Sequence, residues 1–391
     1  MAKTRIGILT GGGDVPGLNA VIKSVVYHAS ETGDFEVVGI RRGWLGLTRA
    51  NLDRGLDPEN FIHLNRDNTR TVDRSGGTFL HTSRTRPARM RGAMLPGHVQ
   101  PKLASCTEVE PGYFDLTPVV LNNLQKLRID YLLAIGGDDT LSYASVLHQQ
   151  GFPVIAVPKT MDNDVQNTEY CIGFSTAVTR AVDAVRRQTT TIGSHERIGM
   201  FRIFGRDAGF TAFYTAYVAS IRCCIPEAPF DLAQLIDLLI ADKKSNPSRY
   251  ALVALSEGAT WKGRVVEEYG EADAYGHRKK VNIAEALSDE VRSRTGEETV
   301  VSDLTYDLRS GDPDFLDKMV AYSFASMAFE CIAEGARGRM MAVRNGCYTD
   351  TELPDPALGA RQLDVETMYD RARFRPQYGA KKGLPVFLTR A

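Results

Sequence analysis

The chain has 391 residues, of which 43% are hydrophobic and 24% charged, and its net charge is −1. This length predicts one large two-lobed unit or two domains, and the charge balance gives no basis for binding nucleic acid or an anionic membrane. No apolar run approaches the roughly 18 residues of a membrane span, and neither a signal peptide nor a zinc motif is recognisable. We therefore expect a cytoplasmic protein whose six cysteines are reduced thiols.

Short apolar segments alternate with helical patterns along the chain. The pattern predicts strands at residues 5–10, 35–43, 131–137, 153–160, 197–205 and 250–258. Helices are expected at residues 17–30, 119–128, 140–150, 176–192, 208–221 and 281–296, whereas residues 87–118 have no clear period and are expected to form a surface excursion. This alternation predicts an α/β fold with mainly parallel sheets, in which ligands bind beyond the C-terminal ends of the strands.

Two glycine clusters follow predicted strands. In "TGGGDVPGLNA" (residues 10–20) the glycines allow backbone N–H groups to approach an anion, although such turns are also common in α/β proteins without a ligand. In "GGTFLHTSRTRP" (residues 76–87), Arg84 and Arg86 are two positions apart, so on an extended segment both point the same way and can bind phosphate oxygens. A solvated basic loop is the alternative for this second cluster.

Two further clusters, "GGDDT" (residues 136–140) and "PKTMDND" (residues 158–164), also follow apolar strands and are expected at one edge of the sheet. Lys159 can neutralise phosphate charge, and the aspartates can accept a proton or hold magnesium through carboxylate oxygens. A structural Asx turn is the alternative for an isolated D-N-D sequence.

Together these motifs resemble the phosphofructokinase family, in the family's order, over roughly residues 6–325. The matching segments are "ILTGGGDVPGLNAVI", "GWLGL", "GGTFLHTSR", "AIGGDDT", "PKTMDND", "GSHERIGMFRIFGRDAG", "IPEAPF" and "YDLRSGDPD", and the last 60 or so residues carry no such motif. The resemblance implies two Rossmann-like lobes with the active site in the cleft between them. Residues 1–174 plus about 308–345 would bind the phosphate donor, and about 175–307 plus 346–391 would bind the sugar phosphate.

The resemblance also implies magnesium-dependent, reversible phosphoryl transfer to the 1-hydroxyl of fructose 6-phosphate, a reaction of glycolysis and gluconeogenesis. Asp162 would accept the hydroxyl proton, Arg206 would stabilise charge on the transferred group, and Thr160 would contact that group or the substrate. The residues implied to hold magnesium are Asp138 and Asp164. Those implied to bind the donor are Gly12, Gly13, Gly137, Asp139, Lys159, Arg84 and Arg86.

The sugar phosphate would be bound by Asp164, Gly205, Glu227, Tyr306 and Arg309. Arg197 would reach the same site from a neighbouring subunit, so the resemblance implies a homodimer or homotetramer with a shared active site.

The pair Asp139 and Lys159 bears on the choice of phosphate donor. Members of the family that use ATP typically have glycine at both positions, which leaves room for the α-phosphate and nucleoside. An Asp139 carboxylate would occupy that room, and like charges about 4 Å apart repel by about 4 kcal/mol at an effective dielectric near 20, roughly several hundredfold in affinity. An Asp and Lys pair is typical of the pyrophosphate-dependent members of the family, and we expect pyrophosphate as the donor.

Several alternatives stay open at this point. The chain can instead be an ATP-dependent 6-phosphofructokinase, or a pyrophosphate-dependent kinase of sedoheptulose 7-phosphate, since Val300 and Tyr306 stand where many members have Arg and His. NAD kinases and lipid kinases share a GGDGT-like turn, but "PKTMDND" and "FGRDAG" argue against them. A regulatory subunit without activity would be expected to lose the carboxylates that this chain retains.

Overall fold

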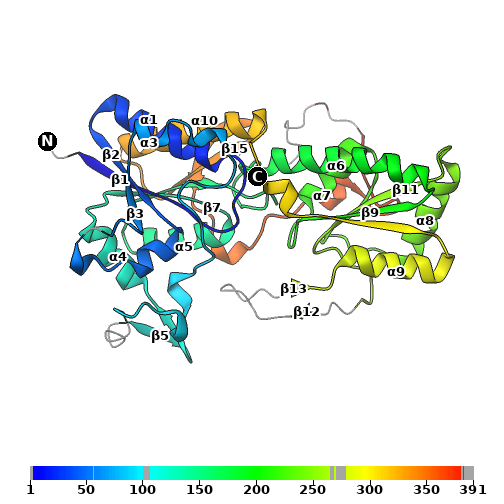
Figure 1. Cartoon of the computed structure of the whole chain (residues 1–391), viewed down its shortest axis with the longest axis horizontal. Helices are drawn as coiled ribbons and strands as arrows, with labels where there is room; N and C mark the ends of the chain where they lie inside the picture. The colour runs from blue at the N-terminus through cyan, green and yellow to red at the C-terminus, as the bar shows by residue number, and fades with distance from the viewer. Residues whose placement is uncertain are drawn as a thin grey trace.

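The protein is described here by a computed structural model that covers residues 3–55, 57–99, 106–264, 268–269, 279–379 and 382. Two α/β lobes lie next to each other along the long axis of the molecule (Figure 1). Helices and mainly parallel strands alternate in both lobes, so the predicted fold class is confirmed.

A seven-stranded sheet in the order β16-β15-β8-β7-β1-β2-β3 forms the first lobe. Its strands are β1 (Thr4–Thr10), β2 (Phe35–Ile40), β3 (Phe61–Leu64), β7 (Tyr131–Gly136), β8 (Val154–Pro158), β15 (Arg339–Arg344) and β16 (Cys347–Glu352). The five central strands are parallel, and the two edge strands are antiparallel to their neighbours. The C-terminal ends of β1, β7 and β8 therefore lie at one edge of the sheet, as the sequence predicted for the motifs that follow them.

Helices cover both faces of this sheet. They are α1 (Leu18–Thr32), α2 (Trp44–Arg49), α3 (Arg66–Thr69), α4 (Thr117–Lys126), α5 (Asp138–Gln149) and α10 (Phe315–Ala333). The alternating side chains of β1 explain the layers, because Ile6 and Ile8 pack in the cluster that contains α1 and α10, whereas Leu9 packs in the cluster beneath α2, α4 and α5. Short 3-10 turns at Leu52–Arg54, Val72–Arg74, Pro87–Arg89 and Gly92–Met94 complete this lobe.

The second lobe contains a parallel four-stranded sheet in the order β10-β11-β9-β14. Its strands are β9 (Ile198–Ile203), β10 (Arg222–Cys224), β11 (Ala251–Ser256) and β14 (Thr299–Leu304), and its helices are α6 (Phe174–Ser194), α7 (Phe210–Ala219), α8 (Leu232–Ser245) and α9 (Ile283–Thr295). A 3-10 helix, η6 (Tyr306–Arg309), follows β14, and a two-stranded pair joins β12 (Glu268–Tyr269) to β13 (Lys279–Lys280). One cluster of buried hydrophobic residues contains members from both lobes, for example Ile6 in β1 and Val253 in β11.

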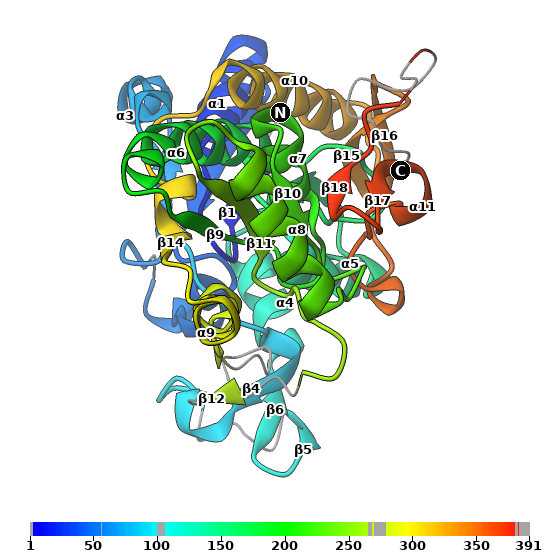
Figure 2. The same ribbon diagram turned by 90° about the vertical axis from the view of Figure 1, so that its right-hand side faces the viewer.

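The predicted surface excursion is partly ordered. Strands β4 (Met90–Arg91), β5 (Thr107–Glu110) and β6 (Tyr113–Asp115) form a small antiparallel sheet that projects from the first lobe (Figure 2). It has its own apolar cluster of Met90, Leu95, Val99 and Leu116. Strands as short as these leave too few residues for a period to be recognised in the sequence.

The division of the chain at residue 346 needs a correction. Strand β16 lies beyond that boundary, yet it pairs along its whole length with β15 in the sheet of the first lobe. Only after β16 does the chain cross to the second lobe, by way of a 3-10 turn at Pro356–Leu358, α11 (Val365–Met368), β17 (Tyr369–Asp370) and β18 (Arg375–Pro376). There the N–H of Cys223 donates to the carbonyl of Phe374 at 2.9 Å. Among the described residues, no helix has the length and apolar character that crossing a membrane requires.

Candidate active site

A cleft of about 540 Å³ lies where the two lobes meet. Its walls come from the turns that follow β1, β7 and β8 in the first lobe, from those that follow β9 and β11 in the second, and from the C-terminal segment. Twelve predicted site residues line it: Gly12, Gly13, Arg84, Gly137, Asp138, Asp139, Lys159, Thr160, Asp162, Asp164, Arg206 and Arg309. Six motifs far apart in the sequence therefore converge on one cavity.

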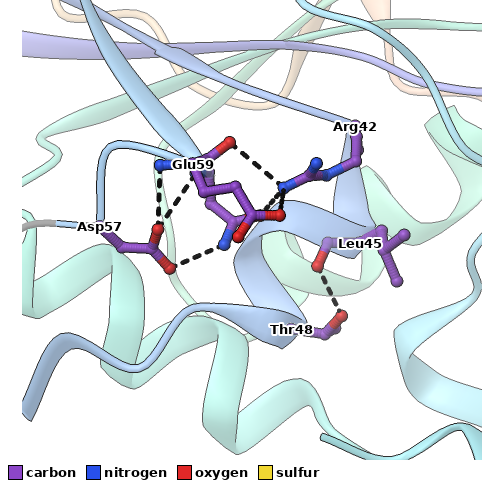
Figure 3. A network of polar contacts seen from close by, with 6 residues as sticks. Arg42, Leu45, Thr48, Asp57 and Glu59 are labelled. Carbon is purple, nitrogen blue, oxygen red and sulfur yellow. Dashed lines mark hydrogen bonds and ion pairs between the residues drawn. The ribbon is translucent and has the colours of Figure 1, made fainter.

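The glycine turn after β1 is held against the segment that carries Arg84. Gly12 donates its N–H to the carbonyl of Ser83 at 3.0 Å, and its φ of +77° favours glycine. The Oγ of Ser83 donates in turn to the carbonyl of Arg42 at 2.7 Å. The guanidinium of Arg42 is fixed by the side chains of Glu59, at 3.0 Å, and Asn60, at 2.7 Å (Figure 3). This network fixes the segment that carries Arg84; Arg84 and Arg86 are both exposed, but only Arg84 lines the cleft.

Helix α5 presents its N-terminus to the cleft. It begins at Asp138 directly after Gly137, and the N–H groups of Thr140 and Leu141 are the first to bond within the helix, each to the carbonyl of Gly137. The N–H groups of the first turn and the positive end of the helix dipole favour an anion here. Binding of the donor at Gly137, which the family resemblance implies, stays a prediction.

Lys159 lies at the centre of a cationic end of the cleft that also contains Arg84 and Arg309. Its side chain is only 3% exposed, and Nζ donates to the carbonyl of Gly13 at 2.5 Å. Burial lowers the pKa of Lys159 to about 8, with Arg309 and Arg84 acting in the same direction. The carboxylate that most favours the charged form is Asp14, which also lies 3.6 Å from the Nε of Arg309.

The acidic end of the cleft is a group of carboxylates that influence one another: Asp138, Asp162, Asp164, Asp207 and Glu257. Burial raises the pKa of Asp164 to about 6, with contributions from Asp138 and Asp207. Burial also raises the pKa of Asp162 well above its usual value, as do Asp164 and Glu257. The buried Oδ1 of Asp162 has no hydrogen-bond partner within the described residues, so this carboxylate has an oxygen available for a proton.

The catalytic loop (residues 158–164) is fixed by backbone contacts. Lys159 donates its N–H to Gly136 at 2.9 Å, and Thr160 donates its N–H to Ile172 at 3.1 Å. Asn163 has a φ of +54°, and its side-chain oxygen accepts from the N–H of Cys171 at 2.8 Å. The "DND" sequence therefore forms a structural turn and also carries two acids. The structural interpretation as a turn and the functional interpretation as a source of carboxylates do not exclude each other.

The acids fit a magnesium ion. Asp138 raises the pKa of Asp164, which means that the two carboxylates lie close enough to repel. The described residues contain no group of three or more His, Cys, Asp or Glu side chains that could hold a metal. Magnesium is usually held by one or two carboxylates together with water and substrate phosphates, and Asp138 and Asp164 suit that mode.

Arg206 is held between the ends of β9 and β11. The carbonyl of Gly205 accepts from the Oγ of Ser256 at 2.5 Å and from the N–H of Gly258 at 3.0 Å. A Cβ atom on Gly258 would lie 1.8 Å from the carbonyl oxygen of Arg206, so only glycine fits there. Gly205 itself lies behind the cleft wall and shapes the turn that presents Arg206.

Glu227 does not line the cleft, but its buried Oε2 has no hydrogen-bond partner among the described residues, so its expected role in sugar binding stays a prediction. Its Oε1 accepts from the N–H groups of Gly209 at 2.9 Å and Leu363 at 3.0 Å. Glu257 faces the cleft instead and pairs with Arg202 at 3.0 Å. Sequence reasoning missed Glu257, although an acid directly after the buried strand "ALVALS" was a usable signal.

The two remaining predicted residues lie outside the cleft. Arg197 precedes β9, whereas Arg206 follows it, so the two are separated by roughly 20 Å of strand. Arg197 pairs with Glu298 at 2.7 Å, and a contribution to a neighbouring subunit stays a prediction. Tyr306 is 66% exposed, with the guanidinium of Arg309 over its ring at 4.7 Å. No prediction was made for five further cleft residues, Asp14, Asp207, Gly359, Ala360 and Gln362.

Comparison with known proteins agrees with this arrangement. The description of the phosphofructokinase family matches residues 5–332. The chain belongs to the phosphofructokinase family. It is 35% identical over 353 residues to "ATP-dependent 6-phosphofructokinase 3" of Streptomyces coelicolor, covering 89% of this chain and 92% of that protein. It is also 35% identical over 365 residues to "Pyrophosphate--fructose 6-phosphate 1-phosphotransferase" of Amycolatopsis methanolica, covering 93% and 97%.

A solved phosphofructokinase structure supports the fold. The pyrophosphate-dependent phosphofructokinase from Marinobacter aquaeolei superposes with a TM-score of 0.75 at 18% identity, covering 98% of this chain and 90% of that one. The names of equally similar relatives are divided between two phosphate donors. The donor used by this phosphofructokinase therefore has to be argued from its own cleft.

Proposed function

We propose that this phosphofructokinase transfers a phosphoryl group reversibly from pyrophosphate to the 1-hydroxyl of fructose 6-phosphate, in a magnesium-dependent reaction. The products are fructose 1,6-bisphosphate and phosphate. The observation that carries the choice of donor is the buried Lys159, whose ammonium group reaches across to the carbonyl of Gly13.

The cationic end suits a small, highly charged donor. Lys159, Arg84 and Arg309 surround the glycine turn, and a Cβ on Gly13 would lie 2.9 Å from Nη1 of Arg309. Phosphate oxygens accept charge-assisted hydrogen bonds from such groups. Pyrophosphate needs no space for an α-phosphate or a nucleoside, so the lysine side chain between the catalytic loop and the glycine turn does not obstruct it.

Asp139 acts against ATP by charge. It lies in the first turn of α5 and lines the cleft next to Asp138, whose pKa it raises. A third phosphate close to this carboxylate would meet a like charge, which costs about 4 kcal/mol at about 4 Å and an effective dielectric near 20. Of the carboxylates that favour the charged form of Lys159, Asp14 has a larger effect than Asp139.

The transfer follows from the placement of the side chains. Asp162 takes the proton of the 1-hydroxyl as that oxygen forms a bond to the phosphorus atom, and the bridging P–O bond of pyrophosphate breaks. Arg206 stabilises the negative charge on the transferred group, and Lys159 with Arg84 holds the departing phosphate. Magnesium, held by Asp138 and Asp164 when bound, supplies neutralisation of the donor's charge. We assign the acceptance of hydrogen bonds from sugar hydroxyls to Glu257, because it lines the cleft and Glu227 does not.

ATP-dependent transfer is the second candidate, because a relative of equal identity carries that name. Sedoheptulose 7-phosphate is the alternative acceptor. A matrix of two donors, pyrophosphate and ATP, against the two sugar phosphates separates these activities. Robust turnover with ATP and none with pyrophosphate would overturn the proposed donor, and a monomer that is fully active at all concentrations would overturn the proposed shared site.

A further inference from the structure

The C-terminal part of the chain supplies one wall of the cleft. We call residues 359–363 the strap; they lead from β16 in the first lobe to α11 on the second. The strap lies beyond the residues that match the family, which end at 332. Gly359, Ala360 and Gln362 all line the cleft, so the site contains a wall that none of the matched motifs describes.

The strap is anchored to the catalytic loop by Arg361. Its backbone N–H donates to the carbonyl of Asp164 at 2.7 Å, and its guanidinium donates to the carbonyl of Asn163 at 2.6 Å. The side chain is only 5% exposed and lies over the ring of Phe210 at 4.4 Å. These contacts hold the strap directly against the loop that carries Asp162.

The strap is also anchored to the second lobe. Leu363, which is 3% exposed, donates its N–H to Glu227 Oε1 at 3.0 Å. Between the two buried residues, the Gln362 side chain is exposed to the cleft, and its Nε2 donates to the carbonyl of Asp207 at 2.8 Å. The buried neighbours on either side thus fix the direction in which Gln362 points, as expected for an extended segment.

The position of Gln362 in the cleft indicates what it can bind. It lies at the acidic end, against Asp207 and next to the strap residue that binds the backbone of Asp164. Phosphate groups are favoured at the other end, near Lys159. Because the amide nitrogen of Gln362 donates to a carbonyl, its amide oxygen is the atom that can accept a hydrogen bond from a ligand. The hydroxyl groups of a sugar next to the reacting hydroxyl can donate such a bond.

We propose that Gln362 accepts a hydrogen bond from a hydroxyl of the sugar-phosphate acceptor and helps to determine which acceptor is used. This inference rests on the proposed function, since it assigns a residue to the acceptor of that reaction. It differs from the contacts implied by the family resemblance, because those lie within the matched residues.

The test compares Gln362→Leu with Gln234→Leu. Gln234 is a matched control, because its Nε2 also donates to a backbone carbonyl of the C-terminal segment, that of Ala372 at 2.9 Å, but outside the cleft. For Gln362→Leu we expect the KM for fructose 6-phosphate to rise about 10-fold, while the KM for pyrophosphate and the melting temperature match those of the control. Gln362→Asn retains the amide but shortens its reach. Its KM for fructose 6-phosphate should lie between those of Gln362→Leu and Gln234→Leu.

Three results would overturn the proposal: an unchanged acceptor KM in Gln362→Leu, an equal rise in both KM values, or an equal acceptor effect in the control. Equilibrium binding of fructose 6-phosphate to the same variants gives a readout that does not depend on turnover. A wrong proposed function gives a different result. In that case the unaltered enzyme itself does not turn over fructose 6-phosphate with either donor.

Discussion

Replacing Lys159 by Met tests how the donor is held. Met has a similar length and no charge, so the variant removes the ammonium group from the cationic end while filling its space. A hydrogen bond to a charged group contributes roughly 1.5–3 kcal/mol, so the KM for pyrophosphate should rise roughly 10- to 150-fold. The KM for fructose 6-phosphate should change little, because Lys159 lies on the donor side, against Gly13.

The pH dependence sharpens this test. Because burial lowers the pKa of Lys159 to about 8, the charged form that binds the donor is present below that pH and is lost above it. At pH 9 only about one-eleventh of the enzyme keeps the charge, so kcat/KM for pyrophosphate should fall about 10-fold from its plateau. Lys159→Met should lack this step, and titration of pyrophosphate itself cancels in the ratio of the two profiles. A ratio that stays constant from pH 7 to pH 9 would refute the assigned role.

Four other substitutions test the acidic end and its support. Asp162→Asn should lower kcat by about 10²- to 10⁴-fold and leave the melting temperature unchanged or higher, because it removes a charge from crowded carboxylates; near-normal turnover would contradict its role as the base. Glu257→Gln should raise the KM for fructose 6-phosphate about 10-fold, whereas Glu227→Gln should not, and the reverse order would restore the original assignment. Gly258→Ala should displace Arg206 and reduce kcat, and an unchanged kcat would show that the turn can adjust.

The sequence predicted the parts of the site that depend on strand ends. The motifs after β1, β7 and β8 meet because the C-terminal ends of parallel strands share an edge of the sheet, and that follows from the α/β pattern alone. Arg84 and Arg86 show the limit of this reasoning. Their spacing of two residues predicted that both would bind the donor, but only Arg84 lines the cleft, and Arg86 stands directly before a 3-10 turn that begins at Pro87.

Contacts between distant segments could not be predicted. Glu227 and Glu257 are both acids close to strand ends, and the sequence does not show that only Glu257 lines the cleft or that backbone N–H groups of Gly209 and Leu363 hold Oε1 of Glu227. The strap has no periodic pattern or motif of its own, and its place in the cleft depends on hydrogen bonds to the catalytic loop. Strand β16 was assigned to the wrong lobe for the same reason, because hairpin pairing with β15 is a tertiary contact.

Choice of the phosphate donor is the central claim, and initial rates of the purified enzyme test it most directly. Rates are measured with fructose 6-phosphate and magnesium, with either pyrophosphate or ATP as the donor, for the unaltered enzyme and for Asp139→Gly. The account predicts turnover of the unaltered enzyme with pyrophosphate and none above background with ATP, and tighter binding of ATP by Asp139→Gly. Robust turnover with ATP, together with none with pyrophosphate, would contradict it.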